Sequence, residues 1–151
     1  MRNGEKHLHC QAGPYRLLVS VHDILEIADY HPAVCEASGN AALHHRKTVT
    51  WRNHDIPFLG LRQCLQLEPA EPANTVIVQG DNQEPIAMLA VDSVYGILSV
   101  EEDKLFHFEG IHAELNTLFD LLYLDPASDQ MLMHLRQAAA WIPAFLQPIE
   151  P

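Results

Sequence analysis

Short apolar runs separated by turn residues constrain the fold of this chain more than any other feature of its sequence. The runs are too short for helices of several turns, and many alternate between apolar and polar residues, as half-buried strands do. Pro, Gly, Asn and Asp lie between them and favour tight turns. We therefore expect a mainly β protein with strands at YRLLVSV from Tyr15, TVIVQG from Thr75, EPIAMLAVD from Glu84, VYGILSV from Val94 and LFDLLYLD from Leu118.

The N-terminal part predicts a hairpin, in which HLHC and the turn QAGP precede YRLLVSV. Further strands are expected at Thr48–Trp51 and at Ile56–Leu61, on either side of a polar turn. The second of these contains Pro57, so we expect a short strand that is buried on both faces, with the proline at an edge or a bulge. Pro, Gly, Ser and Asn in residues 31–47 predict a long connection.

The C-terminal stretch is the one place where a helical period continues over several turns. Met131, Leu135, Ala138 and Ile142 would share one face of a helix that starts at Ser128 or Asp129. We expect this helix, Ser128 to Ile142, to be the longest in the protein, and Pro143 to end or kink it.

The length of 151 residues suits one domain, or two small lobes that share a core. The proline-rich segment EPAEPAN, residues 68–74, predicts a break between the two halves of the chain. Because this segment is short, it suits a hinge or crossover better than a linker between independent domains. We expect a single domain over residues 1–151.

The charge balance and the hydropathy limit the possible partners. Nine basic against 20 acidic residues give a formal charge of -11, so the basic surface that binds nucleic acid or anionic lipid is missing. No apolar run approaches the roughly 20 residues that cross a bilayer, and the first residues lack the apolar core of a signal peptide. We expect a cytoplasmic protein, without membrane insertion, whose partners are proteins or small molecules.

Histidines and cysteines suggest metal chemistry only weakly. The three cysteines, at 10, 35 and 64, form no CxxC pair, and the histidine clusters His7/His9 and His44/His45 lack a third ligand at a recognisable spacing. Ser20, His22 and Asp23 include the residue types of a hydrolytic triad, but no GxSxG elbow and no phosphate-binding glycine loop occurs. We expect neither a metal, a cofactor nor a catalytic residue.

Four segments in order resemble the CheW-like domain of bacterial chemotaxis coupling proteins, over almost the whole chain. YRLLVSVHDILEI is similar to the opening strand and the V-x-E-I element of the family. TWRNHDIPFLGLR resembles its N-L-R-G-x-x-x-P-x-x-D-L-R segment, with Arg52, Pro57, Leu61 and Arg62 retained. NTVIVQGDNQEPIAMLAVDSVYGIL follows its hairpin and V-D-x-V signature, and LFDLLYLDPASDQML resembles its closing strand and L-L-D-x-x-x-L-L helix start.

The resemblance implies two small SH3-like five-stranded β-barrel lobes packed together, with a C-terminal helix. It also implies a non-enzymatic adaptor that connects the cytoplasmic helical tip of a chemoreceptor to the regulatory domain of a CheA-type histidine kinase. The residues that the resemblance places at a partner surface are Ile24, Glu26, Ile27, Arg52, Val76, Met88 and Ile97. Two other classes stay open: a β-barrel module that binds a small molecule, and a small metal-dependent enzyme.

Departures from the family pattern concentrate around Arg52. Trp51 and Asn53 replace a leucine and a glycine of the family, Gly60 replaces the Asp before Leu-Arg, and Lys47 stands where a glycine is common. Asn still tolerates the left-handed conformation that a turn requires. These differences are typical of a divergent coupling protein, for instance one of a pilus-type or other alternative chemosensory pathway. Arg52 itself has two interpretations, as a partner contact or as an internal ion pair with Glu26.

Overall fold

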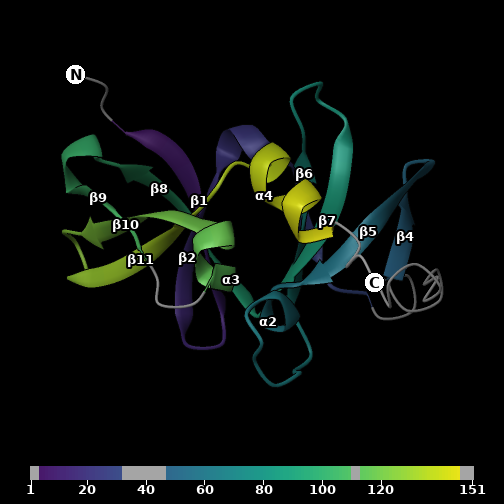
Figure 1. The fold of residues 1–151 in the computed structure, drawn as a ribbon, viewed down its shortest axis with the longest axis horizontal. Helices are drawn as coiled ribbons and strands as arrows, with labels where there is room; N and C mark the ends of the chain where they lie inside the picture. The colour runs from purple at the N-terminus through teal and green to yellow at the C-terminus, as the bar shows by residue number, and fades with distance from the viewer. Residues whose placement is uncertain (1–3, 32–46, 110–112, 147–151) are drawn as a thin grey trace.

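Two curved β-sheets lie side by side, with short helices between them (Figure 1). The computed structural model describes residues 4–31, 47–109 and 113–146. The expected long connection, together with Cys35 and the His44/His45 cluster, lies outside these ranges. The expectation of a mainly β fold with a C-terminal helix is confirmed.

The larger sheet has six strands in the order β8-β1-β2-β11-β10-β9. Its strands come from both ends of the chain, since the N-terminal hairpin pairs with β8 on one side and with β11 on the other. The bounds are β1 Glu5–Ala12, β2 Tyr15–Ser20, β8 Ser93–Val100, β9 Leu105–His107, β10 Phe119–Asp125 and β11 Gln130–Leu135.

The smaller sheet has five strands in the order β3-β6-β7-β5-β4 and is formed by the middle of the chain. The bounds are β3 Ile24–Asp29, β4 Lys47–Trp51, β5 His54–Gly60, β6 Asn74–Gln79 and β7 Pro85–Val91. Within the residues that the structure describes, neither strand order closes on itself through backbone pairing. The lobes are therefore curled sheets of six and five strands, where the resemblance implied two five-stranded β-barrel lobes.

The prediction of a long C-terminal helix from Ser128 is wrong in its first half, because Gln130–Leu135 forms strand β11. The Ser128 hydroxyl donates to the Asp125 carboxylate at 2.7 Å, and the Ala127 N–H donates to the same carboxylate at 3.1 Å. These bonds stabilise a turn that pairs β11 with β10, so Ser128 caps a turn and not a helix. Tertiary pairing on both sides of β11 outweighs the helical spacing of its apolar residues.

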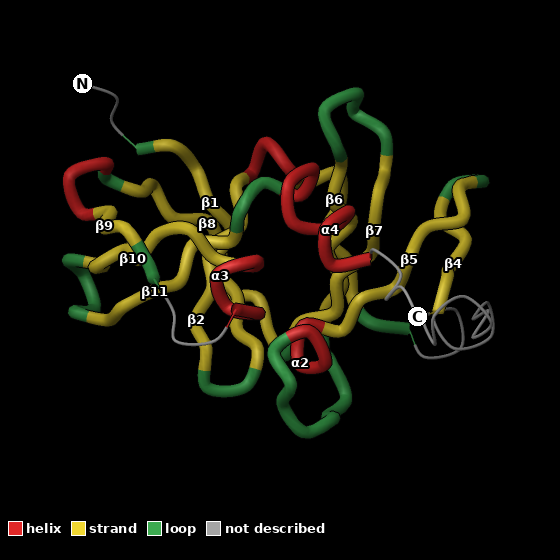
Figure 2. Tube along the Cα trace, viewed as in Figure 1, coloured by secondary structure: helices red, strands yellow, loops and turns green. Residues whose placement is uncertain are grey.

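Short helices connect the strands, and α2, α3 and α4 lie between the two sheets (Figure 2). The last one, α4, continues through Pro143, where the sequence predicted an end or a kink. The bounds are η1 Val21–Asp23, α2 Leu61–Cys64, η2 Glu102–Lys104, α3 Ala113–Leu118 and α4 Ala138–Leu146. No helix within residues 4–31, 47–109 and 113–146 is long and apolar enough to cross a membrane.

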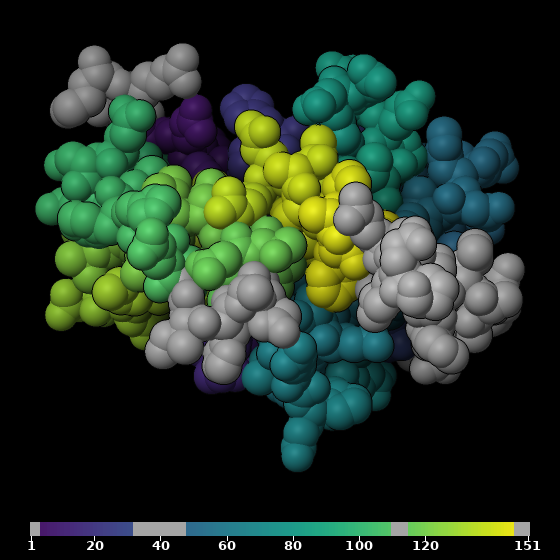
Figure 3. Space-filling view, viewed as in Figure 1, coloured from purple at the N-terminus to yellow at the C-terminus, as the bar shows by residue number. Residues whose placement is uncertain are grey.

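A single large core joins the two sheets. Side chains of both sheets pack in it around Trp141 and Ile142 of α4 and Phe119 of β10. Each curled sheet also encloses a smaller cluster, one around Ile77 and the other around Tyr123. The space-filling view shows α4 packed into the junction between the sheets (Figure 3), so neither sheet buries its inner face without the other.

The chain crosses between the sheets at two points, through η1 from β2 to β3 and at Asp92 from β7 to β8. The proline-rich segment 68–74 instead leads from α2 to β6, and the strands before and after it, β5 and β6, both belong to the five-stranded sheet. Strand β5 is an interior strand, and its pairing with β7 starts at Phe58, directly after Pro57. Its Ile56 and Leu59 are buried, whereas Pro57 and Phe58 are only half-buried.

Candidate functional site

The turn between β4 and β5 presents Arg52 at the tip of a hairpin. Trp51 pairs with His54, which leaves Arg52 and Asn53 as the two turn residues. Both have positive φ angles, 45° and 67°, as the twist-compatible two-residue hairpin turn requires. Asn53 therefore serves the turn in place of the glycine of the family.

Glu26 of β3 receives two hydrogen bonds from this hairpin. Arg52 Nη2 donates to Glu26 Oε1 at 2.7 Å, and Trp51 Nε1 donates to Glu26 Oε2 at 3.2 Å. The Arg52 guanidinium carbon also lies 4.6 Å from the centroid of the Trp51 ring. Because β3 and β4 are the two edges of the five-stranded sheet, these side chains join its edges where backbone pairing does not.

The ion pair is accessible to solvent, with 70% of the Arg52 side chain and 36% of the Glu26 side chain exposed. The structure is therefore compatible with both interpretations of Arg52, the internal ion pair and the partner contact. Its guanidinium is held by Glu26, as an internal pair would be, and most of its surface can still be reached by a partner. Trp51, a departure from the family, belongs to this group, which we call the Trp51–Arg52–Glu26 corner. The sequence predicted Glu26 as a possible partner of Arg52, but it gave no sign that the Trp51 N–H donates to the same carboxylate.

A bulge in β3 arranges the rest of the V-x-E-I element. Ile24 pairs with Val78 and Ile27 with Val76, while the register shifts between Ile24 and Glu26. Since paired residues point to the same face of a sheet, Ile24 and Ile27 share the face of the inter-sheet core. Ile24 packs against that core, whereas Ile27, on the edge strand, is 40% exposed. Val21 of η1 and Leu25 of β3, which were not predicted, are also exposed.

Two of the residues expected at the partner surface lie in the interior. Val76 is fully buried in the inter-sheet core and Met88 is 6% exposed in the cluster inside the five-stranded sheet. Ile97, in contrast, is 51% exposed on β8, the edge of the six-stranded sheet, and Tyr95 is exposed on the same strand. The structure brings Glu26 and Arg52 into contact, places Ile27 on the same edge strand but on the opposite face from Glu26, and places Ile97 on the other sheet.

Arg62 and Asp92 form a second ion pair, which ties the two lobes together. Arg62 Nε and Nη2 each donate to one Asp92 oxygen at 2.8 Å, and the Gly13 N–H in the β1–β2 turn donates to Asp92 at 2.7 Å. Burial opposes ionisation of Asp92, but the hydrogen bonds from Arg62 and Gly13 outweigh it and lower the pKa of the carboxyl. The hydrogen bonds to Asp92 in turn raise the pKa of Arg62.

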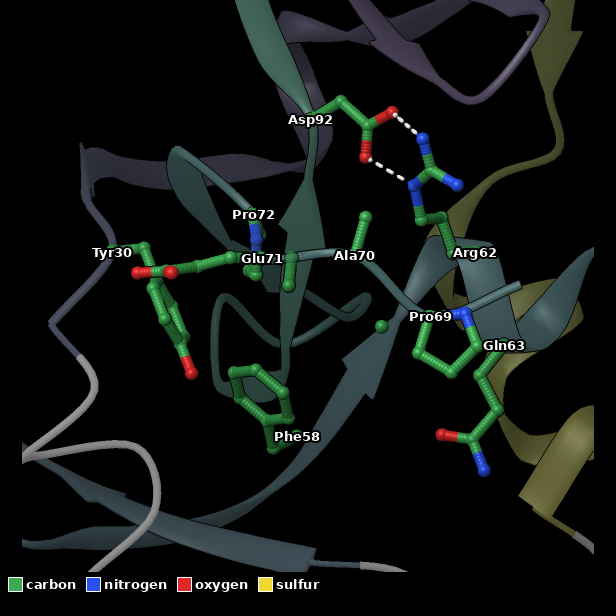
Figure 4. Close-up of a pocket in the computed structure, with 11 residues that line it drawn as sticks. Tyr30, Phe58, Arg62, Gln63, Pro69, Ala70, Glu71, Pro72 and Asp92 are labelled. Carbon is green, nitrogen blue, oxygen red and sulfur yellow. Dashed lines mark hydrogen bonds and ion pairs between the residues drawn. The ribbon is translucent and has the colours of Figure 1, made fainter. Parts of the chain in front are cut away.

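A cavity of about 440 Å³ opens beside this ion pair (Figure 4). Tyr30 and Phe58 lie on one side of it, and Arg62 with Asp92 on the other. Gly60 also lines the cavity, and a Cβ at this position would meet no atom within 4 Å. Replacement of the family's Asp by Gly60 therefore leaves this space open. Lys47 is the first residue of β4 and pairs with Phe58.

The residue types that suggested catalysis have structural roles. The Ser20 oxygen accepts a hydrogen bond from the His22 backbone N–H, and Asp23 accepts one from the backbone N–H of Ala138 at the start of α4. Burial raises the pKa of Asp23. His7 bonds to His134, whereas His9 packs on Tyr95, so the two rings have different neighbours. Among the residues in the described ranges, no three His, Cys, Asp or Glu side chains gather as a metal site.

Comparison with known proteins identifies the family and the fold. The family model of the CheW-like domain matches residues 6–118. The structure is similar to the crystal structure of the scaffolding protein TtCheW from Thermoanaerobacter tengcongensis, with a TM-score of 0.67 and 13% sequence identity. That match covers 88% of this chain and 89% of the other. No curated protein sequence matches the chain at a significant level.

Proposed function

The chain belongs to the CheW-like domain family, and on that premise we propose that it is a non-enzymatic adaptor between a chemoreceptor and a CheA-type histidine kinase. In this proposal it binds the cytoplasmic helical tip of the receptor and the regulatory domain of the kinase, and it therefore works in the cytoplasm. Neither contact requires a cofactor. The similar solved structure is itself described as a scaffolding protein.

The observation that carries the proposal is the Trp51–Arg52–Glu26 corner. Glu26 and Trp51 hold the Arg52 guanidinium in one place, so little conformational freedom is lost when it binds. Most of the Arg52 side chain is exposed, and its planar donors suit carboxylate or carbonyl oxygens of a partner helix. We assign this corner to the receptor tip.

Apolar side chains on the same edge strand complete the proposed receptor surface. Leu25 and Ile27 are exposed on β3, and Val21 is exposed just before it. Ile27 points to the opposite face of β3 from Glu26, so in this proposal an amphipathic helix lies across the open edge of β3 and contacts Ile27 on one side and Arg52 on the other. The buried Val76 and Met88 are not part of this surface.

We assign the kinase contact to β8. Tyr95 and Ile97 are exposed there on an edge strand of the other sheet. An adaptor must bind two partners at once, and surfaces on different lobes allow this without overlap. The departures at Trp51 and Asn53 lie only at the corner, so a receptor of a pilus-type or other alternative pathway would be recognised there.

The test is a calorimetric titration of the chain with each isolated partner fragment and then with both. We expect one-to-one binding of each, and a ternary complex. Arg52→Ala should weaken only receptor binding and Ile97→Asp only kinase binding, while His107→Gln, on the exposed face of β9, serves as the control. If neither fragment of any candidate pathway binds, or if both compete for one surface, the proposal is wrong.

The cavity beside Arg62 favours a second candidate function, the binding of a small molecule. Its volume of about 440 Å³ and its Tyr30 and Phe58 walls are typical of small-ligand sites. A ligand of this cavity would raise the melting temperature of the chain without either partner. Screening a compound library by thermal shift, with Phe58→Ala as the control, separates this function from the adaptor.

A further inference from the structure

Two histidines from opposite ends of the chain, His7 and His134, come into contact in the six-stranded sheet. His7 of β1 pairs with Ser20, and His134 of β11 pairs with Leu18, on the two sides of strand β2. Their Nε2 atoms are 3.0 Å apart, and only 3% of His7 is exposed. Beside them is a cavity of about 230 Å³ that is also lined by Glu5 and Glu102.

The other ring nitrogen of each histidine also has a hydrogen-bond partner. His7 Nδ1 is 3.1 Å from the Glu5 carbonyl oxygen, and His134 Nδ1 is 2.7 Å from Asp120 Oδ1. A backbone carbonyl only accepts, so His7 Nδ1 must carry a hydrogen. The ionised Asp120 carboxylate likewise only accepts, so His134 Nδ1 must carry one too.

The hydrogen bond between the two Nε2 atoms then needs a third ring proton. Two neutral imidazoles carry two protons, which the Nδ1 atoms already use. Without a third proton, two Nε2 lone pairs would face each other at 3.0 Å. With a fourth, two N–H groups would face each other. Three protons are the one number that satisfies all three hydrogen bonds.

We propose that His7, His134 and Asp120 form a pH-dependent clasp, in which the two histidine rings share one extra proton and thereby connect β1 to β10 and β11. The extra proton lies between the Nε2 atoms, and the charge is balanced by Asp120. Loss of this proton at high pH, or gain of another at low pH, breaks one of the three hydrogen bonds.

The charges around the clasp favour one extra proton and oppose a second. Glu5 and Glu102 line the cavity, and Asp23 of η1 lies near His134, so carboxylates face the pair from several elements. The positively charged Arg136 is close to Asp120, and His22 is close to His7. Burial lowers the pKa of His7, which disfavours a charge on that ring. Burial opposes ionisation of Asp120. The interaction with His134 outweighs this effect of burial, so the pKa of the Asp120 carboxyl is lowered.

The clasp gives folding stability a maximum in pH. In the unfolded chain, two histidines with the ordinary pKa of about 6.5 share on average one extra proton near pH 6.5. Above that pH the unfolded state binds fewer protons than the folded pair, so stability falls as pH rises. Below it the unfolded state binds more, so stability falls as pH falls. This contribution therefore peaks at about pH 6.5.

The clasp is close to the crossing into the proposed partner strand, because His22 and Asp23 of η1 directly precede β3. Asp23 accepts the backbone N–H of Ala138, so η1 and the start of α4 meet beside the pair.

The experiment measures urea unfolding from pH 5 to 8.5, together with long-range nitrogen NMR of the histidine rings. We expect a stability maximum near pH 6.5 that is lost in His134→Gln and in Asp120→Asn and kept in His107→Gln, whose ring is exposed. The NMR spectrum at pH 7 should show one charged ring for the pair, with His7 bearing its hydrogen on Nδ1. Two neutral rings at pH 7, or equal pH profiles of the wild-type chain and His134→Gln, would overturn the proposal. If the variants do not fold, the ring spectrum of the wild-type chain decides.

Discussion

The indole N–H of Trp51 donates to the Glu26 carboxylate and so joins the two edge strands of the five-stranded sheet. The Trp51 ring also packs against the cluster around Ile77 inside this sheet. Trp51, which stands where the family has a leucine, thus joins the two edges of the lobe and supports Arg52 at the same time.

We predict that Trp51→Phe and Trp51→Ala differ in cost. Phenylalanine keeps most of the packing and loses the N–H donor, so the free energy of unfolding should fall by about 1 kcal/mol. Alanine also removes the ring from a partly buried cluster and should cost about 2–4 kcal/mol. Urea denaturation measures both values. Equal values for the two variants would mean that the ring does not support the lobe.

Ile27 and Val76 are register partners on β3 and β6, and they form a matched pair for a second prediction. Val76→Ala should lower the free energy of unfolding by about 1–3 kcal/mol, because its side chain is fully buried. Ile27→Ala should cost less than about 1 kcal/mol and should weaken binding of the receptor tip. The reverse order of the two stabilities would show that β3 packs differently from the structure described.

The third prediction concerns Asp92 and the free energy of unfolding at acid pH. Its pKa is lowered below the model-compound value of 3.8, so its ionised form stabilises the fold above that pH. This contribution is lost as pH falls below about 4 and through the lowered pKa. Asp92→Asn should cost about 1–3 kcal/mol at pH 7 and should flatten the stability profile below pH 4. An unchanged acid profile in this variant, measured by urea unfolding at pH 2.5 to 7, would contradict the prediction.

Strands could be predicted from the sequence because their alternation and their turn residues are local. Ser128 shows the limit of local patterns, since the same residue can cap a helix or a turn. Here the Ser128 hydroxyl donates to the Asp125 carboxylate, three residues away, and this hydrogen bond stabilises the turn. The six-stranded order also depends on pairing between the two ends of the chain, which no local pattern contains.

The candidate site was predictable only in part. The resemblance named Glu26 and Arg52, which the structure brings into contact at the surface, and also Val76 and Met88, which the sheet turns inward. Alternation alone does not tell which face of a strand is covered by a second sheet. The contact of His7 with His134 joins residues 127 positions apart, so only the folded arrangement brings them together.

Arg52 provides the most direct test of the adaptor proposal, because a single substitution separates binding from folding. The measurement is the free energy of unfolding of Arg52→Ala and its affinity for the receptor tip, on one preparation. We predict a loss of stability of at most about 1 kcal/mol, as for an exposed ion pair, and a loss of affinity of about 2 kcal/mol, which is roughly 30-fold. A variant that is strongly destabilised, while its folded fraction binds the receptor tip normally, would contradict the proposal at its central residue.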